Sequence, residues 1–195
     1  LAAEVARDSL LELGPTFVKL GQVLSTRTDV LPKEYTDVLQ SLQDDVPAFS
    51  GERAKQIVCE ELELSSISDK FKSFSDEPVA AASLGQVHRA TLITGEEVAI
   101  KVQRAGLREL FDVDLKNLRK ACELLDKLDP KSDGADRSYI DVFDESEKLL
   151  YQEIDYVNEA DNADRFRQDF KGKYNVRVPE VYRKLSTPRV LTMEF

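Results

Sequence analysis

The sequence predicts an α+β fold, in which helices lead into a small antiparallel sheet that carries long helices between its strands. Apolar residues recur at helical spacing over the first quarter of the chain, and strand-like alternation replaces this spacing between residues 71 and 102. Two long helical stretches and a further pair of strand-like segments follow. With 195 residues, 42% of them hydrophobic, the chain is large enough to bury a core of ordinary size.

The leading segment, residues 1–68, is predicted to be a helical extension. Gly14 and Pro15 end its first helix, and Thr16 follows in a position to cap the second. Proline residues mark the next boundaries, because proline opens a helix more readily than it continues one. Further helices are expected over about residues 33–42 and 51–64.

The remaining segment, residues 69–195, is predicted to form a sheet with long helices inserted into it. Strands are expected over residues 71–74, 86–93, 97–102, 180–185 and 189–194. Helices are expected over residues 107–128 and 139–170, separated by a loop at 130–134. This order is that of the small lobe of a protein kinase, in which five antiparallel strands carry a helix between the third and the fourth. Likeness of fold alone does not settle function.

Composition excludes several classes of function. The 27 basic residues face 37 acidic ones, and a net charge of −10 without basic clusters argues against a nucleic-acid partner. Two cysteines, Cys59 and Cys122, and a single histidine predict buried free thiols rather than disulfides or a zinc site. No apolar run approaches the roughly 20 residues of a membrane-spanning helix, and no targeting leader is recognisable.

The tetrapeptide Val98-Ala-Ile-Lys101 places a lysine at the end of an apolar strand. In protein kinases, a lysine in this arrangement contacts the α and β phosphates of the nucleotide. Gly85 and Val87 lie one hairpin earlier, where they match the last glycine and the valine of a Gly-x-Gly-x-x-Gly-x-Val phosphate loop. Alanines occupy the positions of its first two glycines. The alternative for Lys101 taken alone is a solvated strand end.

A phosphate-binding lysine needs a carboxylate to hold its long side chain, and the helix that follows should supply one. On one continuous helix Asp155 and Glu159 share a face, whereas Glu153 points about 120° away from Glu159 at roughly 100° per residue. Acidic groups therefore occupy two faces. Apolar and aromatic residues interleave with them, which argues against the alternative of a uniformly solvated helix surface.

A third motif lies in the helical extension, where Lys19 and Gln22 are neighbours about one turn apart. Gly21 between them costs about 1 kcal/mol relative to alanine, and this cost is understandable if another group approaches the backbone closely. A surface lysine and glutamine with an incidental glycine are the alternative from these residues alone.

Together these motifs resemble the signatures of the UbiB-type (aarF-domain) atypical kinases, and they occur in the right order over essentially the whole chain. They are Lys19-x-Gly21-Gln22, the alanine-rich stretch from Ala80 to Gln86, Val98-Ala-Ile-Lys101, and Glu153-x-Asp155 followed by Asn158-Glu-Ala160. Residues 110–115 and 151–156 look most like the plastid and cyanobacterial branch. Ala105 departs from the family, which commonly has proline there, with little expected consequence.

The resemblance implies a nucleotide site. Lys101 would contact phosphate, with Glu159 as its helix partner, and the alanine-rich loop would cover the nucleotide. Residues 190–195 would begin the hinge at which adenine meets the backbone. The residues implied are Ala80, Ala81, Ala82, Ser83, Leu84, Gly85, Gln86, Val87, Lys101, Glu159 and Glu194.

The resemblance also implies a regulatory motif, in which the helical extension hinders access of protein substrates. Lys19 would pair with the acidic motif of Glu153 and Asp155, and Gln22, next to Gly21, would project into the cleft. Alanine at positions 80 and 82 restricts the backbone, so we expect a stiffer loop with a looser amide cradle than three glycines would give. Weak or altered handling of ATP would follow.

The functional expectation is incomplete within this chain, because no His-Arg-Asp or Asp-Phe-Gly equivalent supplies a catalytic base or a magnesium ligand. By resemblance, a full-length member would bind ATP or ADP with magnesium and act as an atypical kinase or ATPase in prenylquinone or isoprenoid lipid metabolism. Plastids (plastoglobules or thylakoids) are favoured over mitochondria, with cyanobacteria as the other source. Membrane-associated lipid or quinone-biosynthesis proteins are the expected partners.

Two alternatives stay open at this point. One is a non-catalytic regulatory module that resembles a pseudokinase and binds a membrane-associated partner. The other is a helical bundle with a small sheet and no nucleotide, which the joint spacing of the motifs disfavours.

Overall fold

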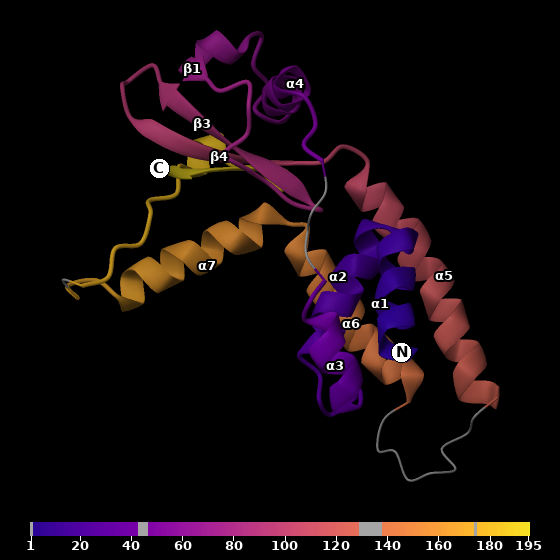
Figure 1. The fold of residues 1–195 in the computed structure, drawn as a ribbon. Helices are drawn as coiled ribbons and strands as arrows, with labels where there is room; N and C mark the ends of the chain where they lie inside the picture. Colours follow the sequence, from indigo (N-terminus) through magenta and orange to yellow (C-terminus); the bar gives the residue numbers. More distant parts are fainter. Residues whose placement is uncertain (1, 43–46, 129–137, 174) are drawn as a thin grey trace. The chain divides into compact units, whose positions relative to one another are not determined.

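The structure, a computed structural model, describes residues 2–42, 47–128, 138–173 and 175–195 (Figure 1). The loop predicted at 130–134 lies outside the described residues. The α-helices are α1 (Ala2–Leu13), α2 (Pro15–Ser25), α3 (Lys33–Leu39), α4 (Gly51–Glu61), α5 (Leu107–Leu128), α6 (Tyr139–Glu153) and α7 (Tyr156–Asp169). The strands are β1 (Phe71–Phe74), β2 (Ala80–Ala81), β3 (Gly85–Leu92), β4 (Glu97–Gln103) and β5 (Val190–Glu194).

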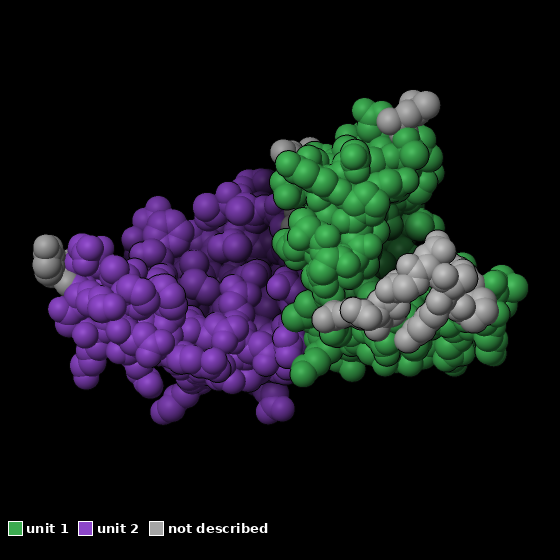
Figure 2. All heavy atoms as spheres, turned by 90° about the horizontal axis from the view of Figure 1, so that it is seen from below, with its two compact units in different colours: residues 1–44, 106–151 green, residues 45–105, 152–195 purple. Residues whose placement is uncertain are grey.

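The chain forms two compact units, which Figure 2 draws in different colours. The helical unit comprises residues 1–44 and 106–151, and the sheet unit comprises residues 45–105 and 152–195. In the part of the chain that the structure describes, no helix is both long and apolar enough to cross a membrane.

The helical unit packs α1, α2 and α3 against one another, and α2 also contacts α5. Thr16 does not cap α2, contrary to prediction. Gly14 occupies the cap position with φ of 102°, a backbone conformation that favours glycine. Thr16 is buried, and its hydroxyl instead donates a hydrogen bond of 2.6 Å to Asp114 Oδ2 on α5. This side chain therefore joins two helices rather than ending one.

The sheet unit is built on the strand order β1-β3-β4-β5, with β2 paired to β3, and every pairing is antiparallel. Figure 1 shows α4 on one face of the sheet and α7 on the other. We call these the α4 face and the α7 face. The α4 face carries the larger apolar core, in which Ile57 and Val58 of α4 pack with Ile100 and Val102 of β4.

Alternation along β4 separates the two faces, because successive side chains of a strand point to opposite sides. Val98, Ile100 and Val102 belong to the core of the α4 face and are fully buried. Lys101 lies between two of them and therefore points to the α7 face. The pairing register places Val87 of β3 opposite Lys101.

One predicted helix, residues 139–170, is wrong as a single element, because it is interrupted between α6 and α7. Asp155 has extended backbone, and its side chain accepts a hydrogen bond of 2.9 Å from the Val157 N–H, which caps α7. Gln103 Nε2 donates to the Ile154 carbonyl at 2.6 Å, and the Tyr156 N–H donates to the Pro188 carbonyl at 3.0 Å. The break is stable because the sheet unit satisfies the backbone groups that a continuous helix would have used.

The predicted number of five strands is confirmed, but one predicted member is wrong. Residues 180–185 form only a bridge between Val181 and Met193 and a short 3-10 helix over Arg183–Leu185. Side-chain hydrogen bonds at Thr192 accompany the change: its N–H donates to Ser186 Oγ at 3.1 Å, and its hydroxyl donates to the Leu185 carbonyl at 2.7 Å. The fifth strand is instead the two-residue β2.

The predicted boundary near residue 68 differs from the division into compact units. Helix α4, predicted within the extension, belongs to the core of the sheet unit, where Ala54 and Ile57 are fully buried. Helix α5, predicted within the lobe at the correct bounds, belongs to the helical unit and buries Phe111 and Leu115. Packing partners distant in sequence therefore decide where these helices belong.

Candidate functional site

Lys101 forms an ion pair with Glu159 on the α7 face of the sheet unit. Its Nζ atom lies 2.6 Å from Glu159 Oε2, which confirms the predicted contact. The lysine side chain is 33% exposed and the glutamate side chain 42% exposed, so a ligand can reach both. The strand fixes the direction of the lysine, and the first turn of α7 supplies the carboxylate.

Tyr156 is a member of this site that the sequence did not indicate as functional. Lys101 Nζ lies 4.7 Å from the centre of the Tyr156 ring, within the range of a cation–π contact. Tyr156 and Glu159 are three residues apart on α7 and so lie on one side of it. The spacing of Tyr156 and Glu159 was the signal in the sequence that could have indicated Tyr156. On the unbroken helix that was predicted, several acidic residues lie nearby, so this pair did not stand out.

The Tyr156 hydroxyl is buried and has no hydrogen-bond partner, and it is the one such side-chain atom within the described residues. The residue is 1% exposed, and burial raises the pKa of the hydroxyl because the phenolate form would lose its hydration. The hydroxyl lies against Gly85, where an added Cβ would be 2.7 Å from it and 2.5 Å from the Val102 carbonyl oxygen. Glycine at position 85 therefore permits β3 to pack closely against β4 and α7.

The alanine-rich stretch forms a tight hairpin of β2 and β3. Ala80 pairs with Val87 and Ala81 pairs with Gln86, and the Ala82 N–H donates to the Gly85 carbonyl at 2.8 Å across the turn. Ala80 and Ala81 are exposed. The turn residues Ser83 and Leu84 are 1% and 7% exposed, so the tip of the turn is packed rather than solvated.

Gln86 points to the α4 face, away from Lys101. Its side-chain oxygen accepts from the Phe49 N–H, and its amide nitrogen donates to the Phe49 carbonyl, both at 2.9 Å. The same nitrogen lies 2.8 Å from His88 Nε2, and His88 Nδ1 lies 2.8 Å from the Ser75 carbonyl oxygen. Only a donor can satisfy that carbonyl, so Nδ1 carries the proton and Nε2 accepts from Gln86. The Gln86 amide is thus committed to structure.

Burial lowers the pKa of His88, which is fully buried. Desolvation is the largest cause. The hydrogen bond to Ser75 and the nearby Asp76 and Glu77 act in the opposite direction, and Lys55 adds to the lowering. The imidazole is therefore neutral within the core of the α4 face, in agreement with the hydrogen-bond arrangement.

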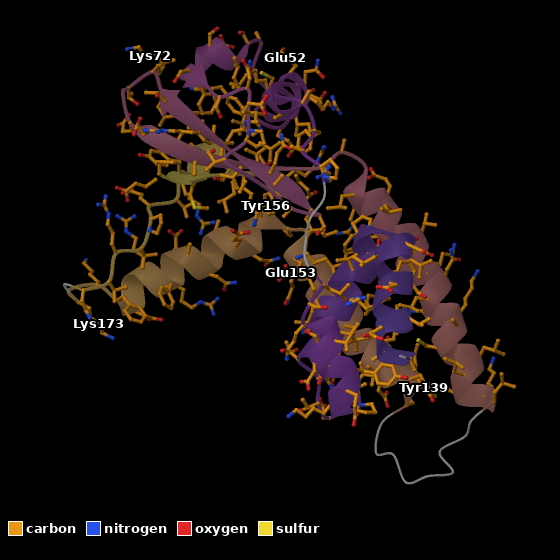
Figure 3. All side chains as sticks on the ribbon, viewed as in Figure 1. Glu52, Lys72, Tyr139, Glu153, Tyr156 and Lys173 are labelled. Carbon is orange, nitrogen blue, oxygen red and sulfur yellow. The ribbon has the colours of Figure 1, made fainter. Side chains whose placement is uncertain are left out.

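Glu153 and Asp155 are separated by the break between α6 and α7, so angles derived for one continuous helix do not apply to them. Glu153 ends α6, and Asp155 caps α7. Figure 3 labels Glu153 and Tyr156 on either side of this break. The pairing of these acids with Lys19 stays a prediction, because Lys19 belongs to the helical unit.

Gly21 is buried in the helical unit, and other groups closely approach it, so the glycine is not incidental. An added Cβ would lie 2.4 Å from a Leu42 methyl carbon and 2.9 Å from one of Leu10. The approaching groups are thus side chains of the same unit. Gln22 Nε2 donates to the Leu42 carbonyl at 3.0 Å, which ties α2 to the end of the segment after α3.

Glu194 lies on β5 opposite Val98 and forms an ion pair with Arg177. Its predicted proximity to adenine stays a prediction. Within the described ranges, no group of three or more His, Cys, Asp or Glu side chains is arranged to hold a metal ion. Cys59 and Cys122 are free and partly buried, and burial is the main cause that raises their pKa values.

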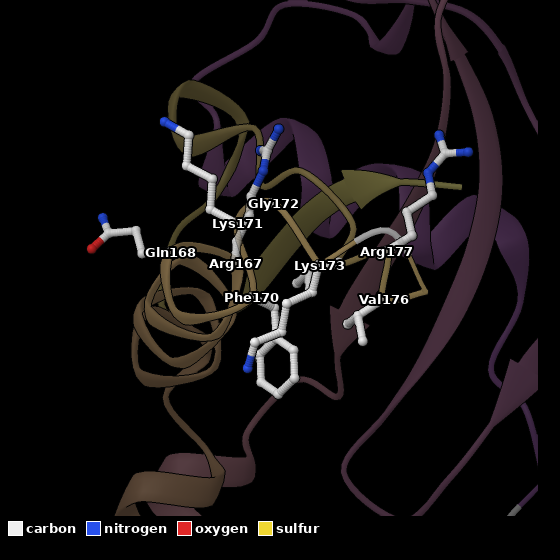
Figure 4. Close-up of a pocket in the computed structure, with 9 residues that line it drawn as sticks. Arg167, Gln168, Phe170, Lys171, Gly172, Lys173, Val176 and Arg177 are labelled. Atoms are coloured by element: carbon white, nitrogen blue, oxygen red, sulfur yellow. The ribbon is translucent and has the colours of Figure 1, made fainter.

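A hollow lies at the C-terminal end of α7, away from the ion pair at its start (Figure 4). Its cationic side chains include Lys171 and Lys173, and the Lys173 ammonium lies 4.4 Å from the centre of the Phe170 ring. Two of its arginines are paired with acids, Arg167 with Glu180 and Arg177 with Glu194. No motif in the sequence indicated this hollow.

A five-stranded antiparallel sheet, whose strand lysine is paired with the carboxylate of a packed helix, defines the small lobe of a protein-kinase-like fold. The family model described as "ABC1 atypical kinase-like domain" matches residues 41–195. The chain belongs to this family, which confirms the resemblance to UbiB-type kinases.

The relatives come from plants, cyanobacteria and other bacteria. Arabidopsis thaliana protein ACTIVITY OF BC1 COMPLEX KINASE 8, chloroplastic, is 54% identical over 99% of this chain and 25% of its own length. The uncharacterized protein sll1770 of Synechocystis is 47% identical over 99% of this chain and 32% of its own. The probable protein kinase UbiB of Pseudomonas fluorescens Pf-5 is 42% identical over 96% and 35%.

A solved structure, the complex of Rv3197 with erythromycin from Mycobacterium tuberculosis, has a TM-score of 0.66 and 32% identity. It matches 90% of this chain and 43% of its own chain. The chain thus spans about a quarter to a third of the length of the curated relatives named above.

Proposed function

We propose that the α7 face of the sheet unit binds an adenine nucleotide, as part of an ABC1-type atypical kinase or ATPase that serves quinone-related metabolism. The observation that carries the proposal is the ion pair of 2.6 Å between Lys101 and Glu159 at the end of the strand motif. Names of relatives support the wider role and favour a plastid or cyanobacterial setting. Action on prenylquinones is the specific form of this role that we propose.

The chemistry of Lys101 suits phosphate. Its ammonium is a compact cation with three donors, held on one side by a carboxylate and on another by the Tyr156 ring. A third of the side chain is exposed, so a phosphate oxygen can approach while Glu159 keeps the stem extended. Magnesium bound with the nucleotide would neutralise further phosphate charge.

A nucleotide titration of the native polypeptide, with any residues that follow Phe195, tests the proposal. Lys101→Met keeps the aliphatic stem and removes the charge. A hydrogen bond to a charged group contributes about 1.5 to 3 kcal/mol, so we expect the Kd for ATP or ADP to rise roughly ten- to hundredfold. Calorimetric titration measures the change.

Lys72→Met is the matched control, because Lys72 lies on β1 of the same sheet and is exposed (Figure 3). We expect this variant to bind as the native protein does. Absence of nucleotide binding by the native polypeptide would instead favour the non-catalytic interaction module. Release of phosphate from ATP, measured with and without prenylquinone precursors or lipid, tests the wider role.

A further inference from the structure

Arg104 follows β4 and contacts the alanine-rich turn at several points. Its backbone N–H donates to the Leu84 carbonyl at 3.0 Å. Its guanidinium donates to the Ala82 carbonyl from Nε at 3.3 Å and from Nη2 at 3.1 Å. Nη2 also donates to the Pro47 carbonyl at 2.8 Å. One side chain therefore joins the turn to the segment that leads into α4.

The environment of this guanidinium is unusual for a surface cation. It is partly buried, its carbon lies 5.5 Å from the centre of the Phe49 ring, and desolvation lowers its pKa. Its hydrogen-bond acceptors among the described residues are carbonyl oxygens. The guanidinium holds its donors in a fixed planar fork, so one arginine can satisfy carbonyl groups of two backbone segments at once.

The turn is held at both of its ends. Alanine side chains offer no polar group, and across the turn the Ala82 N–H bonds to the Gly85 carbonyl. Gly85 fixes the far end by close packing against Val102 and Tyr156. The near end, at Ala82, accepts both bonds of the Arg104 fork at its carbonyl oxygen.

We propose that Arg104 is a positioning residue that holds the alanine-rich turn down on the end of β4, and thereby sets how the turn meets a nucleotide. This proposal rests on the proposed nucleotide site. A turn that is held in place before binding avoids an ordering cost during binding. If the held conformation becomes a minor one, apparent affinity falls by the fraction that remains competent.

The first test uses no nucleotide. In the native polypeptide, exchange of the Ala82 amide with deuterium reports opening of the turn, because this amide is hydrogen-bonded across it. We expect Arg104→Gln to speed this exchange roughly tenfold, the effect of losing about 1.4 kcal/mol of local stability. Arg104→Lys keeps the charge but not the fork, and should lie close to Arg104→Gln.

Arg89→Gln is the matched control, because Arg89 lies on β3 of the same sheet, is exposed, and donates to Glu97. We expect it to leave Ala82 exchange unchanged. Equal exchange in the Arg104→Gln and Arg89→Gln variants overturns the proposal, as does native behaviour of Arg104→Lys. If Arg104→Gln fails to fold, the lysine variant alone decides between these outcomes.

The second test titrates ATP and ADP into the same variants. We expect Arg104→Gln to weaken binding about three- to tenfold and to alter the ratio of the two Kd values, with Arg89→Gln unchanged. Faster exchange with unaltered affinities would overturn the link from turn to nucleotide. A native protein that binds neither nucleotide would reject the proposed function, while the exchange result would still judge the role of Arg104 in the turn.

Discussion

The two faces of the sheet differ in what they do with polar groups. On the α4 face, the polar side chains of Gln86 and His88 are buried, and each of their hydrogen-bonding atoms has a partner. On the α7 face, Lys101 and Glu159 are partly exposed and the Tyr156 hydroxyl lacks a partner. Complete satisfaction favours a single stable arrangement, whereas accessible charge leaves interactions available to a ligand.

The same strand serves both faces. Ile100 and Val102 are fully buried beneath α4, and Lys101 between them reaches the α7 side. The residues of β4 that stabilise the core and the residue that can bind a ligand are thus neighbours in sequence. Because neighbouring positions belong to different faces, substitutions there can change the stability of the unit without removing the charged group, or the reverse.

The largest expected effect comes from the α4 face. Ile100→Ala removes a fully buried side chain from the core shared by α4 and the sheet. Loss of burial and the resulting cavity should lower the free energy of unfolding by about 2 to 5 kcal/mol, measured by urea denaturation of the native polypeptide. Lys101→Met serves as the partner variant on the α7 face. Ala99→Gly is unsuitable for this comparison, because glycine would also increase the conformational freedom of the backbone.

We expect Lys101→Met to lower stability by less than Ile100→Ala does, because a partly exposed ion pair contributes about 0 to 1 kcal/mol. In nucleotide titrations the order should reverse, since only the lysine carries the charge. Similar losses of stability in both variants would mean that the α4 face does not contribute more to stability than the α7 face.

A second, smaller effect should appear as a dependence of stability on pH. His88 is the single histidine of the chain, and its folded pKa is lowered from 6.5. Between this lowered value and 6.5 the unfolded chain binds a proton more readily than the folded one. Stability is therefore fully present above pH 6.5 and is lost as pH falls toward the folded pKa.

Urea denaturation at intervals between pH 7.5 and 5.5 measures this loss; these limits bracket the ordinary histidine value of about 6.5. Protonation of Nε2 would also turn an acceptor of the Gln86 amide into a second donor, so the network opposes it. In His88→Gln the dependence over this range should flatten, although the variant is less stable overall. An unchanged slope would show that His88 isn't the group that titrates.

How much of the fold and of the candidate site could be predicted from the sequence depended on how far apart in the chain the interacting residues lie. The contact between Lys101 and Glu159 was predictable through the family resemblance, because the residues alone offered carboxylates on two faces of the helix. The break at Asp155 was not, because it is stabilised by Gln103 and Pro188, which lie elsewhere in the chain. An aspartate that caps a helix looks the same in sequence as an aspartate on the surface of one.

The α4 face illustrates the same limit. Gln86 belonged to the alanine-rich motif and was grouped with it, but alternation along β3 turns its side chain away from Val87, its neighbour in sequence. Its partner Phe49 lies 37 residues earlier, in a segment without a recognisable motif. The glycine at position 21 was a signal for a close approach, but its sequence neighbours alone did not separate this from an incidental glycine, and they did not identify the approaching leucines.

The smallest expected effect concerns the Tyr156 hydroxyl on the α7 face. Tyr156→Phe removes a buried polar atom that has no partner and keeps the ring beneath the Lys101 ammonium. Removal of an unsatisfied group is neutral or stabilising, so we expect the free energy of unfolding to stay within about 0.5 kcal/mol or to rise. Urea denaturation measures this change, and nucleotide affinity should match that of the native polypeptide.

Tyr156→Leu is the matched comparison, because it keeps an apolar side chain and removes the ring. Loss of the ring should forfeit the cation–π contact, of the order of 0.5 to 2 kcal/mol, and leave a cavity in the cluster with Ala160 and Leu191. We therefore expect both stability and nucleotide affinity to fall. If Tyr156→Phe alone destabilises the protein by more than about 1 kcal/mol, the hydroxyl is satisfied in solution, and the contrast between the two faces rests on accessible charge alone.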